Sequence, residues 1–192
     1  RSADGRLKSE IRDPKSEMDI LLQVALDFLN LSQALRVARE AVAGGADWLE
    51  AGTPLIKSEG LDAVRQLRQE FPHLPIVADL KTMDAGRVEI EAAAKAGASL
   101  AVVLGLASDS TIQECIKAGQ NFGVRIVVDL LGCPDPVARA QAVAAWGAAV
   151  VSLHTPIDEQ MRGAGAFELV HRVAQAVDVP VAVAGGINSE SV

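Results

Sequence analysis

The densest group of residues that could do chemistry is the run Asp79-Leu80-Lys81-Thr82-Met83-Asp84. If residues 76–80 form a strand, Asp79 and Lys81 lie on one side of it, because side chains alternate along a strand. Asp84 then falls in the following loop or in a first helical turn. Such a trio can hold a metal ion, stabilise an enolate oxygen and move a proton. The alternative is a surface ion pair with Asp84 as a helix cap.

Other ionisable residues end short apolar runs. Seven such runs recur along the chain, at residues 20–26, 48–51, 76–80, 100–104, 124–131, 149–153 and 179–184. Five of them end at or beside a carboxylate or an imidazole, which belong to Asp27, Glu50, Asp79, Asp129 and His154. One charge at a strand end can be a cap or a solvated rim residue, but five indicate a common site. His73 and His171 are placed differently, and we interpret them as structural or exposed.

Helical patterns separate the apolar runs, with apolar residues spaced three and four apart. We expect helices at residues 31–43, 61–71, 88–96 and 136–146. Asn30 and Asp135 are suited to cap the first and the last of them. The apolar runs are nearly continuous in Val, Leu, Ile and Ala, which is typical of parallel strands buried on both faces.

This single series predicts an α/β fold, a (β/α)8 TIM barrel, with about seven β/α units in this chain. Catalytic groups of such barrels gather at the carboxyl ends of the strands, where the residues that end the apolar runs would meet. The alternative is a doubly wound open sheet. Against it, Asp27-Phe28-Leu29-Asn30 follows the first run in place of a glycine-rich dinucleotide fingerprint.

Composition bounds the function classes. The 192 residues are 49% hydrophobic, which is enough for one substantial core. A net charge of −7 argues against general binding to nucleic acid or to an anionic membrane, and no apolar run reaches the ~18–20 residues of a membrane span. Cys115 and Cys133 are too few for a disulfide scaffold and form no Cys-x-x-Cys motif, so we expect a cytoplasmic protein.

Residues 1–17 differ from the rest, because nine of these seventeen residues are charged. We interpret this segment as a flexible tail or as a linker from an upstream domain. Residues 18–192 would form the barrel domain. At about 25 residues per unit that length accommodates seven units, so we expect the domain to be C-terminally incomplete, without an eighth strand and with little or no activity alone.

Gly185 and Gly186 follow the seventh apolar run and suit a different task. Glycines let the backbone approach a phosphate closely. In barrels the phosphate site is typically formed by the loops after strands 7 and 8. Both glycines are therefore candidate substrate-binding residues.

The spacing Asp79-x-Lys81-x-x-Asp84 after a third strand resembles the signature of the orotidine monophosphate decarboxylase superfamily. Within it, the chain is similar to the 3-hexulose-6-phosphate synthase family over about residues 20–190. The matching stretches are Leu22-Gln23-Val24-Ala25-Leu26-Asp27, Glu50-x-Gly52-Thr53-Pro54-Leu55-Ile56-Lys57-x-Glu59-Gly60, Val77-Ala78-Asp79-Leu80-Lys81-Thr82-Met83-Asp84-Ala85-Gly86, Val128-Asp129-Leu130, His154-x-x-x-Asp158-x-Gln160 and Gly185-Gly186-Ile187.

The resemblance implies a Mg²⁺-dependent aldol condensation of formaldehyde with D-ribulose 5-phosphate through an enediolate. The product would be D-arabino-hex-3-ulose 6-phosphate, as in the ribulose monophosphate pathway of formaldehyde fixation. Glu50 and Asp79 would hold Mg²⁺, since carboxylate oxygens suit this cation. Lys81 would add a positive charge at the enediolate. His154, which can exchange a proton near neutral pH, is the candidate general base and acid at C1.

The remaining site residues are given roles by the same resemblance. Asp27 and Asp129 would bind substrate hydroxyls or orient Lys81. Asp84 would reach across the interface of a homodimer into the partner's site, so that the active sites are shared. The other expected partners are the sugar phosphate and formaldehyde, with no nucleic acid and no membrane.

Two alternatives stay open. The 3-keto-L-gulonate-6-phosphate decarboxylase (KGPDC) family shares the fold, metal ligands and enediolate chemistry. The KGPDC family has the motif His-Arg-x-Arg after the sixth strand, whereas this chain has His154-Thr155-Pro156-Ile157. The KGPDC family also usually has Glu at the position of Asp129. Both differences favour the synthase family, although that family more often has Gly at the position of Pro156. The second alternative is a non-catalytic barrel subunit, against which the intact set of site residues argues.

Overall fold

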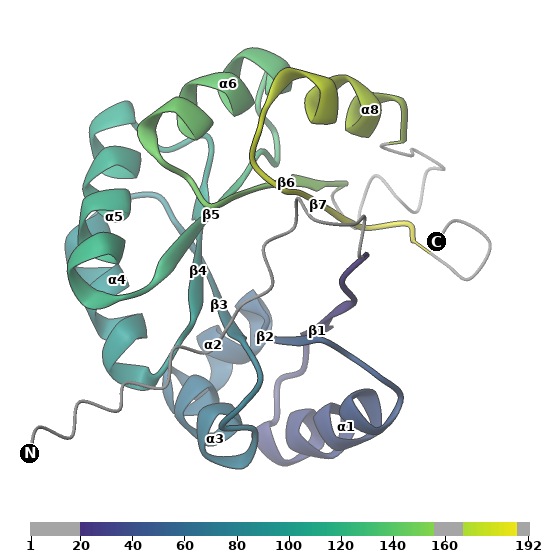
Figure 1. Ribbon diagram of the computed structural model, residues 1–192. Coiled ribbons are helices and arrows are strands. Elements are labelled where there is room, and N and C mark those ends of the chain that lie inside the picture. The colour runs from purple at the N-terminus through teal and green to yellow at the C-terminus, as the bar shows by residue number, and fades with distance from the viewer. Residues whose placement is uncertain (1–19, 156–166, 188–192) are drawn as a thin grey trace, which may run out of the picture.

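A computed structural model describes residues 20–155 and 167–187, which form one parallel sheet with helices outside it (Figure 1). The strands pair in sequence order, each with the next. They are β1 (Gln23–Leu26), β2 (Trp48–Ala51), β3 (Ile76–Thr82), β4 (Leu100–Leu104), β5 (Arg125–Asp129), β6 (Val150–His154) and β7 (Val181–Ala184). The predicted segment 1–17 lies outside the described residues, as do Pro156, Asp158 and Gln160.

The sheet curls around its own interior (Figure 1). A doubly wound sheet has a strand order that reverses from its middle. Here each strand pairs with the next one in sequence, from β1 to β7. The TIM-barrel prediction is therefore confirmed over seven strands, and the open-sheet alternative is wrong. In the described residues no further strand pairs with the outer edge of β1 or of β7.

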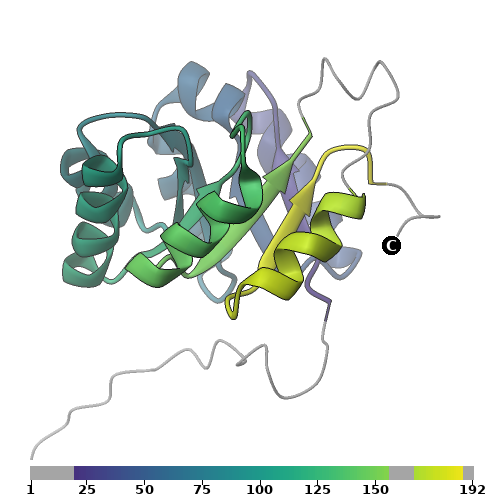
Figure 2. The same cartoon turned by 90° about the horizontal axis from the view of Figure 1, so that it is seen from above.

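Helices cover the outer face of the sheet, as Figure 2 shows from a second direction. They are α1 (Leu31–Ala43), α2 (Thr53–Glu59), α3 (Asp62–Glu70), α4 (Gly86–Ala96), α5 (Asp109–Phe122), α6 (Pro136–Trp146) and α8 (Phe167–Ala176). The bounds predicted for α1 and α6 are confirmed. So are their caps, because Asn30 accepts a hydrogen bond from the Gln33 N–H and Asp135 accepts one from the Ala138 N–H.

Alternation along the strands divides the core in two. Outward-facing residues such as Leu49 and Ile76 pack against the helices in one large cluster. Inward-facing residues form a smaller apolar layer, made of Val77, Leu100, Val102, Val127 and Val150. Further along the same strands, inward positions are occupied by Asp79, Asp129 and His154. The predicted site residues of these strands thus lie beyond the apolar layer, at the carboxyl end of the barrel interior.

The carboxyl end of β3 is longer than predicted and irregular. Its pairing with β2 ends at Ala78, and its pairing with β4 shifts register between Ala78 and Thr82. Lys81 lies inside this irregularity with a φ of 46°. This left-handed conformation costs a residue other than glycine about 1–3 kcal/mol. Such bulges change the direction in which side chains point and are common beside active sites.

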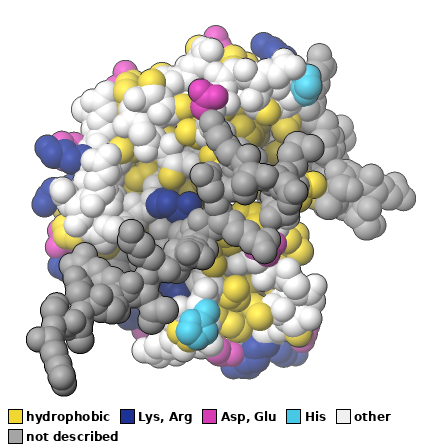
Figure 3. Space-filling model, viewed as in Figure 1, with side chains coloured by type: hydrophobic (Ala, Val, Ile, Leu, Met, Phe, Trp, Pro, Cys, Tyr) yellow, Lys and Arg dark blue, Asp and Glu magenta, His cyan; other side chains and the backbone are white. Residues whose placement is uncertain are grey.

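The face seen in Figure 3 carries charged side chains mainly over the helices at its periphery, with hydrophobic side chains between them. Large hydrophobic residues that are exposed include Leu29, Met83, Val88 and Leu106. Across residues 20–155 and 167–187, no helix combines the length and the apolar character needed to cross a membrane.

Arg68 of α3 connects the loops that precede β3 and β4. Its guanidinium donates to the backbone oxygens of Pro72, Leu74 and Gly97 and to Oγ of Ser99, over distances of 2.6 to 3.0 Å. The single ammonium of Lys cannot reproduce this divergent set of bonds. We therefore expect Arg68→Lys to lower the free energy of unfolding by about 2–4 kcal/mol, measured by urea denaturation.

A matched control lies on the same helix. Arg65 is largely exposed, and its guanidinium lies 3.8 Å from the carboxylate of Asp62, one turn earlier. Arg65→Lys should change the free energy of unfolding by less than about 0.5 kcal/mol. If the two variants unfolded at the same urea concentration, the Arg68 bonds would not contribute to stability.

Candidate active site

The centre of the candidate site is the ammonium group of Lys81. Its Nζ lies 3.0 Å from Oδ2 of Asp79 and 3.0 Å from Oδ2 of Asp129. The two aspartates are only 5% and 2% exposed, so each needs a positive partner to remain charged. This geometry confirms that Asp79 and Lys81 face the same side of β3, and it adds Asp129 from β5.

Asp129 links Lys81 to the candidate base. Its Oδ2 also lies 3.4 Å from Nδ1 of His154, and its Oδ1 accepts a hydrogen bond from the Leu131 N–H. Burial alone would raise the pKa of Asp129, but the bonds with His154 and Lys81 outweigh burial and hold it below its usual range. Asp129 is therefore an anion that contacts two candidate catalytic groups from β3 and β6.

The surroundings also keep Lys81 charged. Burial by itself would lower the pKa of Lys81, yet the charges and hydrogen bonds of Asp79 and Asp129 raise it above the ordinary value. A permanently cationic ammonium at the carboxyl end of the barrel can stabilise negative charge that develops on a substrate.

Glu50 and Asp79 form the candidate cation site. Glu50 is an inward-facing residue of β2, and the amide of Gln23 donates to its Oε2. Burial, and next the charge of Asp79, raise the pKa of Glu50 to about 8. Two carboxylates that repel each other in this way suit a hard divalent cation such as Mg²⁺, which often takes one or two carboxylates with water and substrate oxygens. Within the described residues no group of three or more His, Cys, Asp or Glu is arranged to hold a metal.

Asp27 approaches the same site from β1. Partial burial and then the charge of Asp79 raise its pKa, while Lys81 and His154 act in the opposite direction, so all three lie within electrostatic range. A Cβ added to Gly52 would collide with Oδ1 of Asp27. The glycine at position 52 thus leaves space for this carboxylate.

Asp84 is the one predicted catalytic residue that stands apart. It lies exposed in the loop between β3 and α4, where its carboxylate accepts a hydrogen bond from the Ala85 N–H. In the part of the chain that the structure describes, it makes no hydrogen bond or ion pair with another predicted site residue. Within a single chain Asp84 is therefore not bonded to the other predicted site residues that the structure describes.

Gly185 and Gly186 follow β7 directly, with φ values of 87° and 74° that favour glycine. Ala184, just before them, pairs with His154 across the β6–β7 ladder, so the glycines lie at the same rim as the candidate base. Their role in phosphate binding stays a prediction. His73 and His171 are exposed on a loop and on α8, away from this rim, in agreement with their interpretation as non-catalytic.

One polar contact of the site was missed from the sequence. Oγ1 of Thr53, the first residue of α2, donates to Oδ2 of Asp79. Thr53 lies in one of the stretches that carry the family resemblance, and only this membership could have pointed to it as a site residue.

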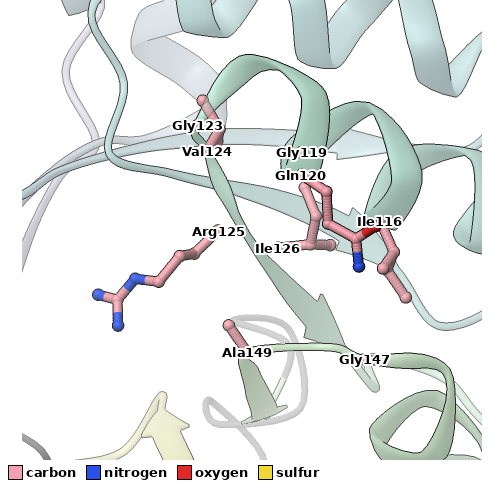
Figure 4. A pocket seen from close by; sticks show the side chains of 9 residues that line it. All are labelled: Ile116, Gly119, Gln120, Gly123, Val124, Arg125, Ile126, Gly147 and Ala149. Atoms are coloured by element: carbon pink, nitrogen blue, oxygen red, sulfur yellow. The ribbon is translucent and has the colours of Figure 1, made fainter.

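A cavity, shown in Figure 4, lies away from the predicted site residues. It has a volume of about 320 Å³ and lies between α5 and the amino-terminal ends of β5 and β6, with Ile116, Gln120 and Ala149 in its lining. The side chain of Arg125 points away from Ile116 and Gln120 (Figure 4) and lies over the Trp48 ring, 5.5 Å from its centroid. None of the predicted site residues lines this cavity.

Known proteins resemble this chain in sequence and in fold. The sequence model of the orotidine 5'-phosphate decarboxylase / HUMPS family matches residues 21–190. A curated relative, the 3-hexulose-6-phosphate synthase of Mycobacterium gastri, is 43% identical over 166 residues, which are 86% of this chain and 80% of the relative.

Solved structures agree as well. A crystal structure of 3-hexulose-6-phosphate synthase matches with a TM-score of 0.83 and 44% identity, over 88% of this chain and 81% of that one. The KGPDC of Streptococcus mutans, solved as a ligand complex, matches with a TM-score of 0.78 and 30% identity, over 90% of this chain and 80% of that one. Both measures of similarity are higher for the synthase.

Proposed function

The chain belongs to the orotidine 5'-phosphate decarboxylase / HUMPS family and is an enzyme similar to its 3-hexulose-6-phosphate synthases, which are aldehyde-lyases, and from this premise we propose the reaction that it catalyses. The reaction is the Mg²⁺-dependent aldol condensation of formaldehyde with D-ribulose 5-phosphate to D-arabino-hex-3-ulose 6-phosphate. The observation that carries this proposal is the ammonium of Lys81, held 3.0 Å from both Asp79 and Asp129, with His154 on the same Asp129 oxygen.

The proton chemistry follows from the arrangement of the side chains. If Nδ1 of His154 carries the hydrogen that faces Asp129, Nε2 is left free to take a proton from C1 of the sugar. The charge of Lys81 stabilises the resulting enediolate. C1 then forms a bond to the carbon of formaldehyde, and the proton on His154 passes to the formaldehyde oxygen. Mg²⁺ held by Glu50 and Asp79 would supply further positive charge for the substrate oxygens.

Two features separate this reaction from the decarboxylase alternative. The sequence after His154 lacks the arginines of the KGPDC family, and Asp129 stands where that family usually has the longer Glu. Thr155, directly after His154, is buried, and its short hydroxyl side chain carries no positive charge.

The site would be completed in a homodimer. Asp84 is exposed and is not bonded to the other described site residues of its own chain, which is compatible with entry into the partner's site. Exposed Met83 and Val88 flank Asp84 and suit an apolar contact between two copies. The two free cysteines and the acidic charge fit a cytoplasmic enzyme.

The proposed reaction predicts that the purified full-length protein consumes formaldehyde when Mg²⁺ and ribulose 5-phosphate are both present. Removing the cation with EDTA should abolish consumption, and added Mg²⁺ should restore it. Glu50→Gln, which removes one carboxylate charge and keeps the side-chain size, should need far more Mg²⁺ for the same rate. Formaldehyde loss can be followed colorimetrically, with the hexulose phosphate identified by mass spectrometry.

Two further measurements bear on the alternatives. Release of CO₂ from 3-keto-L-gulonate 6-phosphate, measured in the same preparation, should be much slower than formaldehyde consumption. If the full-length protein consumed no formaldehyde under these conditions, the proposed function would be wrong.

A further inference from the structure

The side chain of Thr53, the first residue of α2, does not cap its own helix. Helix α2 begins at Thr53 directly after Gly52, and no side chain caps its first turn. The hydroxyl of Thr53 instead reaches across to β3, where Oγ1 lies 2.6 Å from Oδ2 and 3.0 Å from the main-chain oxygen of Asp79. A threonine hydroxyl has one hydrogen to donate, so these two acceptors of one residue share it.

The bond to the Asp79 main chain falls where the ladders on both sides of β3 are interrupted. The β2–β3 ladder ends at Ala78, and the β3–β4 ladder resumes only at Thr82. Asp79 therefore lies in the irregular segment that also contains the strained Lys81. A hydrogen bond from a neighbouring helix fixes the backbone at the position that both ladders leave unpaired.

The bond to the carboxylate fixes the other end of the residue. Oδ2 of Asp79 accepts from Thr53 and lies 3.0 Å from Nζ of Lys81, while Oδ1 lies 3.2 Å from the same Nζ. Two donors from different directions define the plane of the carboxylate. Without Thr53, the ammonium of Lys81 alone would orient Asp79.

We propose that Thr53 is a positioning residue, which holds both the backbone and the carboxylate of Asp79 in the geometry used for cation binding. The inference rests on the proposed function, since that function makes Asp79 a Mg²⁺ ligand. Gly52 acts beside it by leaving room for Asp27. The start of α2 thus sets the geometry of two carboxylates of the site.

The test compares Thr53→Val, which keeps the shape and removes the hydroxyl, with Thr53→Ser, which keeps the hydroxyl. Outer-shell hydrogen bonds to metal ligands are worth about 10–100-fold in metal affinity or activity. Calorimetric titration of the metal-free protein with Mg²⁺ should therefore show affinity reduced by about that factor in the valine variant. The Mg²⁺ affinity of the serine variant should stay within a few-fold of wild type. The rate of formaldehyde consumption should likewise fall more in the valine variant than in the serine variant.

Ser58→Ala provides the matched control, because Ser58 lies on the same helix and donates to the Leu29 main-chain oxygen instead of to Asp79. Its Mg²⁺ affinity should equal that of wild type. Equal affinities in wild type and Thr53→Val, equal losses in the valine and serine variants, or no Mg²⁺ binding to wild type would each overturn the inference. Failure of wild type to consume formaldehyde would count against the proposed reaction, whereas the titration would still decide the role of Thr53.

Discussion

Lys81→Met should reduce kcat for formaldehyde consumption by about 100- to 1000-fold, the usual cost of removing one group that stabilises developing negative charge. Methionine keeps an unbranched side chain, one atom shorter than that of lysine, and carries no charge. The loss should therefore fall on kcat more than on the KM for ribulose 5-phosphate.

The same substitution leaves Asp79 and Asp129 without their shared ammonium. Some loss of stability is expected, so circular dichroism and urea denaturation should accompany the kinetics. Lys95→Met is the matched control, because Lys95 is exposed on α4 and pairs with Glu91, away from the site. A Lys81→Met variant that is folded and retains a rate within about tenfold of wild type would remove Lys81 from the mechanism.

Mixing two inactive variants should restore activity if active sites are shared between subunits. Asp84→Ala and His154→Ala proteins should each be nearly inactive alone. In a mixed dimer, one of the two sites would combine an intact His154 with an intact Asp84 from the other subunit. At equal concentrations and full exchange, about one quarter of all sites would then be active, as the symmetry of a twofold dimer requires.

The measurement is formaldehyde consumption after subunit exchange, with mixed dimers confirmed by native mass spectrometry. Each variant mixed with itself is the control. Confirmed mixed dimers without recovered activity would show that Asp84 does not act across the interface.

Regular parts of the barrel could be predicted from the sequence because their signals are local. The runs at Trp48–Ala51 and Leu100–Leu104 are short, largely apolar and followed directly by a glycine, and the structure has strands with these bounds. Asn30 and Asp135 cap their helices as expected, since capping depends on residues three apart.

Other elements were predicted less well, for reasons that the residues explain. Helix α2 was not delimited, because the closely spaced Gly52, Pro54 and Gly60 are typical of a loop. Strand β3 was ended too early, since its polar residues from Asp79 onward do not fit an apolar run. Val124 and Leu131 were assigned to β5 and lie just outside its ends.

The candidate site, like the fold, could be predicted only in part from the sequence. Knowledge that strand ends meet in a barrel was enough to group Asp27, Glu50, Asp79, Asp129 and His154. It was not enough to show that one oxygen of Asp129 faces both Lys81 and His154. Nor was it enough to find Thr53, whose partner is 26 residues away, because such contacts depend on register and side-chain direction.

The left-handed backbone of Lys81 has a consequence for engineering this barrel. Glycine would relieve the backbone strain at that position, but Lys81→Gly would also leave the buried Asp79 and Asp129 without their shared ammonium, so it would not stabilise the fold. Stabilising substitutions are better sought at the opposite end, where Arg68 joins the loops before β3 and β4. The two ends of the barrel should thus be optimised for different properties, robustness at one and turnover at the other.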